Sequence, residues 1–386
     1  MEKAGAFYES EDWAALNTHL DAAQVIRPYS LYVWKNRILA RQLAGDTDGA
    51  LSLVRTIAER GLSMDISGHP ALDALTAEPD FASIASRMKS NLTPIGDTTV
   101  LTLHKSDELL PEAYALDRQG NAFFGSVRNG SILCISPNGA STGIAFAPGG
   151  VFDIEVRDQK LWAAVNNQLA FEDADPGNSF AALMQFDAKT GAVLRDIRIS
   201  EKDALLGDIE LAKDGTLYGS DSLTPRIFKL DPGADKASVF ATDARFVNLQ
   251  GIALDEKNHR MFLADYLTGL YVVDTETGAV TAISNPTNAH LGGIDGLYYH
   301  KGDLIGIQNG TKPQRIIKIG LSDNAAISLT VLAQNLEPWN EPTHGVINGD
   351  DFHYIATSNW PSYDREWKLR EDTPPQPLRV MAVPLD

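Results

Sequence analysis

The sequence predicts a mainly β fold, a six-bladed β-propeller over residues 96–386, preceded by a small all-α domain over residues 1–95. In the first part, apolar residues recur at helical spacing. The second part consists of short alternating runs divided by Gly, Asn and Asp turns. One phrase returns there six times, and the 232 residues from Glu112 to His344 span five intervals of about 46, the length of a four-stranded blade.

The first 95 residues carry three apolar stripes, and each stripe indicates one amphipathic helix. Pro28 closes the first helix, and Gly45 separates the second from the third. Residues 36–51 resemble a tetratricopeptide helical hairpin, covering about one and a half repeats. A peptide-binding groove is the functional interpretation of such repeats, and a packing cap or partner surface is the alternative for so short an array. The stripes are Trp13, Leu16 and Leu20; Leu31, Trp34, Ile38 and Leu39; and Leu51, Val54, Ile57 and Ala58.

Each copy of the repeated phrase predicts a β-hairpin, and several copies are followed by a third strand that ends in an acidic turn. The turn Lys213-Asp214-Gly215, for example, leads into the second strand 216–220. Separate sandwiches would need roughly 100 residues per unit, and a parallel β-helix would need much shorter coils. Six copies therefore indicate six blades. The copies begin near Pro111, Phe152, Gly207, Leu249, Ile294 and Thr343.

Composition and charge exclude several classes of protein. The chain has 386 residues and a net charge of −18, a sign that repels nucleic-acid phosphates. No apolar run approaches the roughly 20 residues of a membrane span, so we expect a soluble protein, with the compartment left open between the cytoplasm and a periplasmic or secreted location. The single cysteine, Cys134, excludes an internal disulfide and lies in a strand-like run, where a buried, inert thiol is favoured over a nucleophile.

One slot near the start of each inner strand carries polar side chains. In a propeller the innermost strands line the central channel, so equivalent positions gather in a ring at one mouth. Asp is depleted in strands, and four carboxylates in this slot therefore indicate ligands; the alternative is that some of them cap loop N–H groups. Asp153 fits the slot least well, because its phrase lacks the glycine that follows three of the others. The six side chains are Glu112, Asp153, Asp208, Gln250, Asp295 and His344.

Carboxylates that share a confined ring repel one another and take up protons unless a cation compensates their charge. We therefore expect a divalent cation held by Glu112, Asp208, Gln250 and Asp295. Oxygen donors without a thiolate favour Ca²⁺, with Mg²⁺ or Mn²⁺ next, and the one imidazole leaves Zn²⁺ open. His344 is a candidate general base, and a metal ligand and a structural histidine are its alternatives.

A second polar ring is expected where the second strands end, because these strands return to the same mouth of the channel. Its side chains position a polar substrate, support the metal ligands from behind, or cap loops. Among nearby aromatic residues, Trp339, Trp360 and Tyr363 form either an apolar pocket wall or core packing. The second ring comprises Ser126, Asn166, Asp221, Asp265, Gln308 and Ser358, with Asn309 and Asn359 adjacent.

The repeats resemble the six-bladed propellers of the gluconolactonase and senescence-marker-protein (regucalcin) family, with strictosidine synthase-like propellers and paraoxonases as more distant relatives. The resemblance covers roughly residues 97–386 and rests on Pro111-Glu112, on 249–255 with 262–266, and on 294–297. It implies one divalent cation, usually Ca²⁺, at the channel mouth and hydrolysis of lactones or related esters. The family's first-blade Glu and fifth-blade Asp correspond to Glu112 and Asp295. Its fourth-blade Asn is replaced by Gln250, and its third-blade Asn by Gly207-Asp208.

Two functions of different class follow from the sequence. The first is a metal-dependent hydrolase of a lactone or ester, in which Asp295 or His344 activates water. The second is a binding propeller without turnover, with a structural cation and a helical cap that docks a protein partner. An open polar funnel above the ring would favour the first, and a mouth plugged by the helical domain would favour the second.

Overall fold

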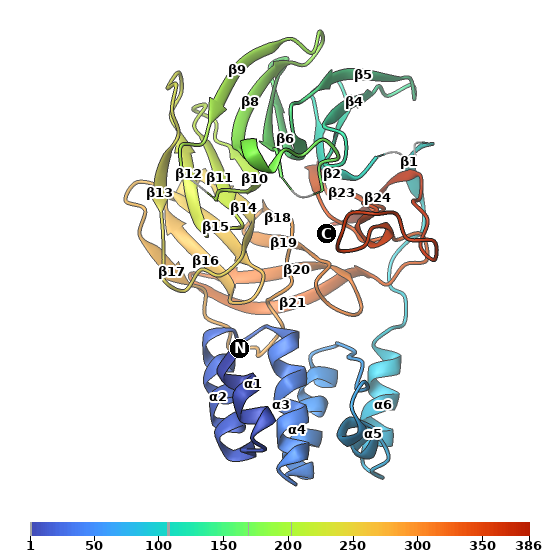
Figure 1. Cartoon of the computed structure of the whole chain (residues 1–386). Helices are drawn as coiled ribbons and strands as arrows, with labels where there is room; N and C mark the ends of the chain where they lie inside the picture. Colours follow the sequence, from blue (N-terminus) through green and yellow to red (C-terminus); the bar gives the residue numbers. More distant parts are fainter. Residues whose placement is uncertain (1, 106–108, 169, 202) are drawn as a thin grey trace.

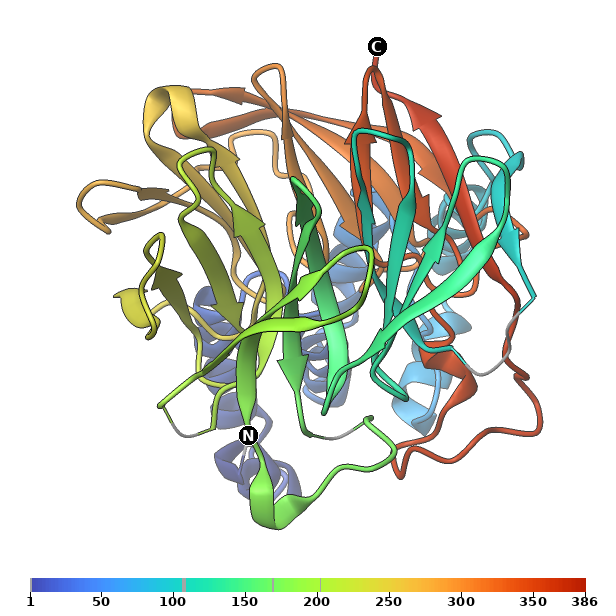
Figure 2. The ribbon, with the colours of Figure 1, turned by 90° about the horizontal axis from the view of Figure 1, so that it is seen from above.

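The computed structural model describes residues 2–105, 109–168, 170–201 and 203–386. Within these ranges the strands form six four-stranded antiparallel sheets arranged around a common channel (Figures 1 and 2). The predicted six-bladed propeller with a preceding helical segment is thereby confirmed. Blades 1 to 3 contain β2 (Pro111–Leu116), β3 (Ala122–Ser126), β4 (Ser131–Ile135) and β5 (Ser141–Phe146); β6 (Gly150–Arg157), β7 (Lys160–Asn166), β8 (Ala181–Asp187) and β9 (Val193–Arg198); and β10 (Leu206–Leu211), β11 (Leu217–Asp221), β12 (Arg226–Leu230) and β13 (Ser238–Ala241).

The last blade closes the ring by joining the two ends of the propeller. Its inner three strands come from the end of the chain, and its outermost strand, β1, comes from just after the helical segment and pairs with β24. The ring is therefore closed by backbone hydrogen bonds between β1, from the start of the propeller, and β24, from its end. Blades 4 to 6 contain β14 (Leu249–Asp255), β15 (Arg260–Asp265), β16 (Gly269–Asp274) and β17 (Val280–Ala282); β18 (Leu297–His300), β19 (Asp303–Gln308), β20 (Arg315–Ser322) and β21 (Ala325–Gln334); and β22 (Gly345–Asn348), β23 (Asp351–Ile355), β24 (Leu378–Pro384) and β1 (Val100–His104).

Adjacent blades pack face to face through apolar side chains. Between blades 2 and 3, for example, Trp162 and Leu183 contact Leu217 and Phe228, and all four are buried. One face of a single four-stranded sheet cannot be covered by its own residues, so the circular arrangement supplies the missing partner. The single cysteine, Cys134, lies in β4 and is half-buried, and burial raises the pKa of its thiol.

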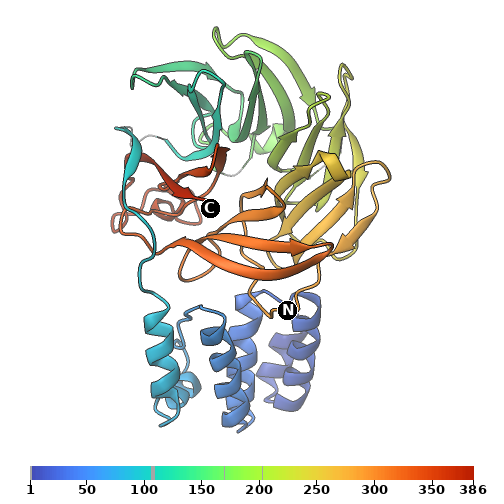
Figure 3. The same ribbon diagram turned by 180° about the vertical axis from the view of Figure 1, so that it is seen from behind.

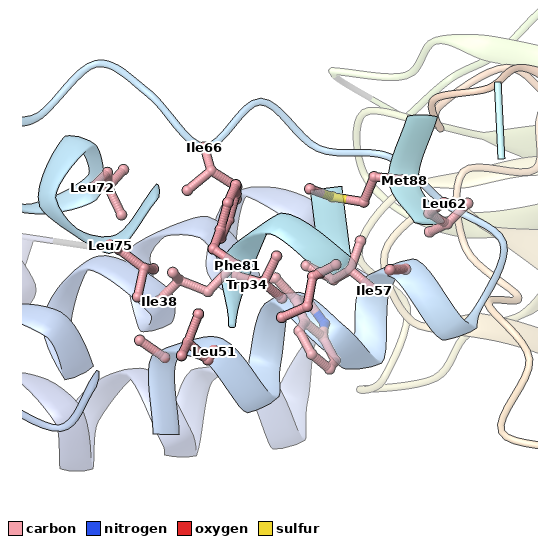
Figure 4. Close-up of a cluster of buried hydrophobic side chains, with 14 residues drawn as sticks. Trp34, Ile38, Leu51, Ile57, Leu62, Ile66, Leu72, Leu75, Phe81 and Met88 are labelled. Atoms are coloured by element: carbon pink, nitrogen blue, oxygen red, sulfur yellow. The ribbon is translucent and has the colours of Figure 1, made fainter. Parts of the chain in front are cut away.

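The helical segment is a bundle with its own core (Figures 1 and 4). Trp34, Ile38, Leu51 and Ile57 form the centre of one buried cluster, as the apolar stripes predicted, and Phe81 and Met88 complete it. Among the described residues no helix is long and apolar enough to cross a membrane. The helices are α1 (Glu2–Glu9), α2 (Trp13–Ile26), α3 (Leu31–Leu43), α4 (Thr47–Glu59), α5 (Pro70–Thr76) and α6 (Phe81–Ser90).

The bundle lies against the edge of the propeller near blades 4 and 5 (Figures 1 and 3). Tyr29, in the loop between α2 and α3, donates its backbone N–H to Leu267 O at 3.1 Å, and Ser63 N donates to Lys312 O at 2.6 Å. Gln334, at the end of β21, donates its amide to Asn91 O and Thr93 O. The helical domain is therefore attached beside the channel.

Candidate functional site

The six side chains of the inner slot lie at different depths in the channel. Each of the first four inner strands pairs its first residue with the last residue of the second strand, and an irregular register follows. Counted from that first residue, Glu112 and Gln250 come one residue later, Asp208 two and Asp153 three. A bulge turns a strand locally, so its position decides where each side chain points. The single level expected from the sequence is replaced by a staggered arrangement.

The outer part of the channel is a cavity of about 400 Å³, which we call the mouth cavity. Its acidic and polar lining includes five members of the predicted ring, namely Glu112, Asp208, Gln250, Asp295 and His344, and the further residues Glu341, Asn248, Ser222 and Asn309. Asp153 lies deeper and lines a different cavity. No described residue of the helical domain lines the mouth cavity, so the bundle does not plug it.

Glu112 and Asp295 each use one carboxylate oxygen in a fixed hydrogen bond. Trp360 donates its indole N–H to Glu112 Oε2 at 2.5 Å, and Asn309 donates its amide to Asp295 Oδ2 at 2.6 Å. Burial, followed by repulsion from Asp295, raises the pKa of Glu112. Burial also raises the pKa of Asp295, to about 6, although the nearby His344 opposes the shift. The two carboxylates are thus close enough to repel each other, and each keeps a second oxygen for a ligand.

Glu341 is a fourth acid of the mouth cavity, after Glu112, Asp208 and Asp295, and the sequence analysis missed it. It lies in the loop before β22 with a φ of 60°, outside the repeated phrase, so the repeat gave no signal for it. Burial, with repulsion from Asp295 as the second cause, raises its pKa to about 7. Asp295 therefore raises the proton affinity of both Glu112 and Glu341 at the channel mouth.

The donors at the mouth fit a hard cation in part. Gln250 donates its amide N–H to Asn248 Oδ1 at 2.9 Å, and this bond directs the amide so that Oε1 is available as an oxygen donor. Glu112, Asp295 and an amide oxygen form the all-oxygen type of donor set that Ca²⁺ prefers. In the described part of the chain, however, no three His, Cys, Asp or Glu side chains are grouped closely enough to hold a metal. A cation would therefore depend on amide oxygens as well as on the two carboxylates.

His344 bridges two acids at the base of the mouth cavity. Its Nε2 lies 3.0 Å from Asp208 Oδ1, and its Nδ1 lies 3.5 Å from Asp153 Oδ1. Asp153 is held in turn by the backbone N–H groups of Ile154 and Ile209, both at 2.8 Å, so it binds the backbone of two strands, β6 and β10, and not the loop backbone of the alternative interpretation. Burial opposes a charge on His344, but Asp208 and Asp153 outweigh it and raise the pKa of the imidazole well above its usual value. The two acids therefore favour the protonated form of the imidazole.

Below this layer lies a second cavity of about 200 Å³, the inner cavity. Glu155 and Glu210 line it, two residues beyond Asp153 on β6 and Asp208 on β10 respectively, as expected where alternate residues of a strand face the same side. Burial, then repulsion from Asp153, raises the pKa of Glu155 to about 8. Burial and Glu155 raise the pKa of Glu210 as well. The sequence analysis missed this pair, although the acidic alternation in both strands was visible.

The second polar ring holds loops in place, which is one of the interpretations that the sequence left open. Asn166 exchanges two hydrogen bonds with the backbone of Leu206 in the next blade, at 2.8 and 2.9 Å. Asp265 accepts bonds from four backbone N–H groups, between 2.6 and 3.0 Å. Asp221 likewise accepts bonds from loop N–H groups, whereas Gln308 and Asn359 donate to loop carbonyl oxygens. These residues fix the loops that carry the inner strands and do not line the mouth cavity, but the adjacent Asn309 lines it and donates to Asp295.

Three aromatic residues from different blades line the mouth cavity. Trp360 lines it, as one of the two interpretations predicted, and Phe152 and Tyr266 join it without having been predicted. Tyr363 packs behind Trp360 in a small apolar cluster. Trp339 instead stacks edge to face on Tyr354, with ring centres 5.9 Å apart, in the core between blades 5 and 6. The three predicted aromatics therefore have different roles.

Comparison with known proteins supports the fold. No protein-family model matches the sequence, and no curated protein matches it. Among solved structures, the chain is similar to the calcium-binding protein regucalcin from Agrobacterium tumefaciens, with 15% identity, a TM-score of 0.51, and 75% of this chain and 94% of that one covered. It is also similar to a gluconolactonase from Xanthomonas campestris, with 14% identity, a TM-score of 0.51, and coverages of 76% and 93%.

A third similar structure is the PQQ-bound aldose sugar dehydrogenase from Streptomyces coelicolor, with 13% identity, a TM-score of 0.51, and coverages of 75% and 98%. The matched parts correspond to about three quarters of this chain in each case. The chain thus belongs to the class of six-bladed propellers. These three proteins are described as a calcium-binding protein, a gluconolactonase and a sugar dehydrogenase, so the shared fold does not identify one activity.

Proposed function

We propose that this protein is a divalent-cation-dependent hydrolase of a lactone or related ester, and that the reaction takes place in the mouth cavity. The observation that carries the proposal is the convergence of Glu112 and Asp295 on one open cavity, with amide groups beside them and no cover from the helical domain. The pKa of both carboxylates is raised, which means that their ionised forms are unfavourable in this cavity. A bound cation would compensate the negative charge and favour the ionised forms. Two proteins of this fold are named as a calcium-binding protein and a gluconolactonase, which agrees with the proposal.

Glu112, Gln250 and Asp295 would hold the cation, and Ca²⁺ suits their oxygen donors best. The cation would polarise the carbonyl group of the substrate. Trp360 and Asn309 fix the orientation of Glu112 and Asp295, since each donates to one carboxylate oxygen. Asp208, predicted as a further ligand, is engaged with His344 through Oδ1 and can contribute only its other oxygen.

Proton transfer would fall to an acid of the mouth cavity. His344, the other predicted base, lies between Asp208 and Asp153, which raise its pKa and engage it at the base of the cavity. We assign it instead to fixing Asp208 at the base of the cavity. Asp295, which faces the cavity, accepts the proton of the attacking water. Phe152, Tyr266 and Trp360, which line the same cavity, would contact the apolar part of the substrate.

The test is an assay of the purified protein with Ca²⁺, Mg²⁺, Mn²⁺ or Zn²⁺ against a panel of aliphatic lactones, sugar lactones and aryl esters. We expect turnover that EDTA abolishes, and a loss of kcat/KM of about 100-fold or more in Glu112→Gln and in Asp295→Asn. Glu155→Gln is the matched control, because Glu155 is a half-buried channel acid outside the mouth cavity. Absence of turnover with every metal, or equal activity in all variants, would reject the hydrolase.

The binding propeller predicted as the alternative differs in this assay. It would bind the cation and gain stability from it, and would hydrolyse nothing above background. The open mouth cavity is the arrangement that the sequence analysis associated with catalysis.

A further inference from the structure

The helical domain contacts the propeller through a tyrosine that fits a socket of two glycines. Tyr29 lies against Gly269 and Gly292, where a Cβ atom would approach the Tyr29 side chain to 2.5 and 2.2 Å. The ring also packs edge to face on His290, with centres 5.3 Å apart, and the hydroxyl accepts a hydrogen bond from Asn285 at 3.0 Å. Only glycine leaves room for this side chain at both positions.

The socket is directly connected to a residue of the mouth cavity. Tyr29 donates its backbone N–H to Leu267 O at 3.1 Å, one residue after Tyr266. Tyr266 O accepts the N–H of Gly293 at 2.8 Å, next to the socket glycine Gly292. Tyr29 therefore contacts both Leu267, which follows Tyr266 in the chain, and Gly292, which precedes the glycine that donates to Tyr266 O.

From Tyr266 the contacts continue to Asp295. The Tyr266 hydroxyl donates to Asn309 Oδ1 at 3.0 Å, and Asn309 donates its amide to Asp295 Oδ2 at 2.6 Å. The first bond fixes which way the Asn309 amide points, because the oxygen faces Tyr266 and the NH₂ group must then face the carboxylate. Gly310 N donates to Gly293 O at 3.1 Å and ties this loop to the socket loop.

A buried arginine forms a second connection between the helical domain and these loops. Arg315 is 2% exposed; its Nε donates to Gln308 Oε1 at 2.8 Å, and its Nη1 lies 3.5 Å from Arg60 O in the helical domain. Gln308 in turn donates to His290 O and Gly292 O, at 2.9 and 2.7 Å. Gln308 directly precedes Asn309 in the chain, so the contacts of Arg315 lead to the same loop as those of Tyr29.

We infer that the helical domain positions the reactive carboxylate, with Tyr29 as a positioning residue that acts on Asp295 through Tyr266 and Asn309. This inference rests on the proposed function, since Asp295 is the residue on which it ends. The domain braces the loops beside blades 4 and 5 and leaves the mouth cavity open. A positioned carboxylate needs such support, because small displacements of a reacting group are costly.

The test compares the full-length protein with Tyr29→Ala, Tyr29→Phe and Tyr32→Ala. Tyr32 is the matched control, because it lies three residues away in α3 and is 64% exposed. Tyr29→Ala empties the socket, and we expect hydrogen exchange at the amides of Tyr266, Gly293 and Gly310 to accelerate about tenfold, with blades 1 to 3 unchanged. Tyr29→Phe removes only the bond to Asn285 and should give a smaller change. It also keeps the comparison possible if Tyr29→Ala does not fold.

Kinetics with the best ester or lactone of the panel then separate positioning from general stability. Tyr29→Ala should lower kcat about tenfold with little change in KM, and Tyr32→Ala should match the wild type. If Tyr29 acts through Tyr266, the double variant with Tyr266→Phe will lose less than the product of the two single effects. Independent effects in this cycle, or unchanged exchange at the three amides, would overturn the inference.

The exchange measurement also separates the two proposals from each other. If the wild-type protein hydrolyses nothing, the proposed function fails, and the exchange rates still decide whether Tyr29 holds the backbone around Tyr266. If the wild type is active and Tyr29→Ala is indistinguishable from it in kcat and exchange, the function stands and the brace is rejected.

Discussion

Replacing Glu155 by Gln should stabilise the protein at alkaline pH and leave its stability unchanged at acid pH. Glu155 lines the inner cavity beside Asp153 and Glu210, and burial followed by repulsion from Asp153 raises its pKa from 4.5 to about 8. A raised pKa means that the folded state binds a proton more tightly than the unfolded chain does. The free energy of unfolding therefore falls as the pH rises from 4.5 to 8 and stays low above that range.

The size of the effect follows from the same values. A rise in the pKa of Glu155 from 4.5 to about 8 corresponds to a loss of about 5 kcal/mol in the free energy of unfolding at high pH, at about 1.36 kcal/mol per pH unit. This value is an upper limit. Glu155 is only half-buried and borders a cavity, so solvent screening reduces the penalty to about 1–2 kcal/mol. The neutral Gln side chain avoids this penalty at every pH.

The measurement is urea unfolding at pH 4, 6.5 and 9, in buffers that contain EDTA so that no cation compensates the acids. Wild type and Glu155→Gln should agree at pH 4, and the variant should gain about 1–2 kcal/mol at pH 9. Asp158→Asn is the control, because it removes an exposed acid from the turn that follows β6. A gain of the same size at pH 4, or no gain at pH 9, would refute the argument from burial and repulsion.

Three further predictions concern the loops, Trp360 and the cation. Asp265→Ala leaves four backbone N–H groups without their acceptor and should cost about 3–4 kcal/mol in urea unfolding, and Asp265→Asn should cost less; equal losses would contradict the role of the acceptor oxygens. Trp360→Phe removes the N–H bond to Glu112 and should lower kcat/KM about tenfold at unchanged stability; unchanged kinetics would show that the bond does not position Glu112. Ca²⁺ at 100 times its Kd should raise the free energy of unfolding by about 2.7 kcal/mol in the wild type and much less in Glu112→Gln, and an equal gain in both would locate the cation elsewhere.

The repeat made the fold predictable from the sequence. Its period of about 46 residues specifies four strands per unit, and turns such as Asp214-Gly215 mark where they reverse. The side chain of Asp214 accepts the N–H of Thr216 at 2.8 Å, and Gly215 adopts a φ of 93°, so the local chemistry fixes the hairpin. The closing strand β1 was harder to foresee, because its sequence does not belong to the repeat.

The depth of each channel side chain could not be read from the sequence. Asp153 and Asp208 occupy similar phrases, yet Asp153 lies one residue further from the start of its strand and lines only the inner cavity, whereas Asp208 lines both cavities. The position of the bulge depends on packing between blades, which a single sequence does not display. Glu341 was missed for another reason, since it reaches the mouth cavity from a loop outside the repeat.

The attachment of the helical domain explains why one side of the site needs support. Glu112 and Asp208 lie within inner strands, whose backbone is fixed by the sheet. Asp295, Asn309 and Glu341 lie outside the strands of their blades, in loops between them. The helical domain contacts the loops of blades 4 and 5 through Tyr29 and Arg60, on the side of Asp295 and Asn309. Its connection to the propeller leads to β1, which lies in the same blade as the strands that follow Glu341. The backbone of Asp295 is bonded to Ile307 and Gly251 of neighbouring strands, so the external contacts act mainly on the loop that carries Asn309, which orients the Asp295 side chain.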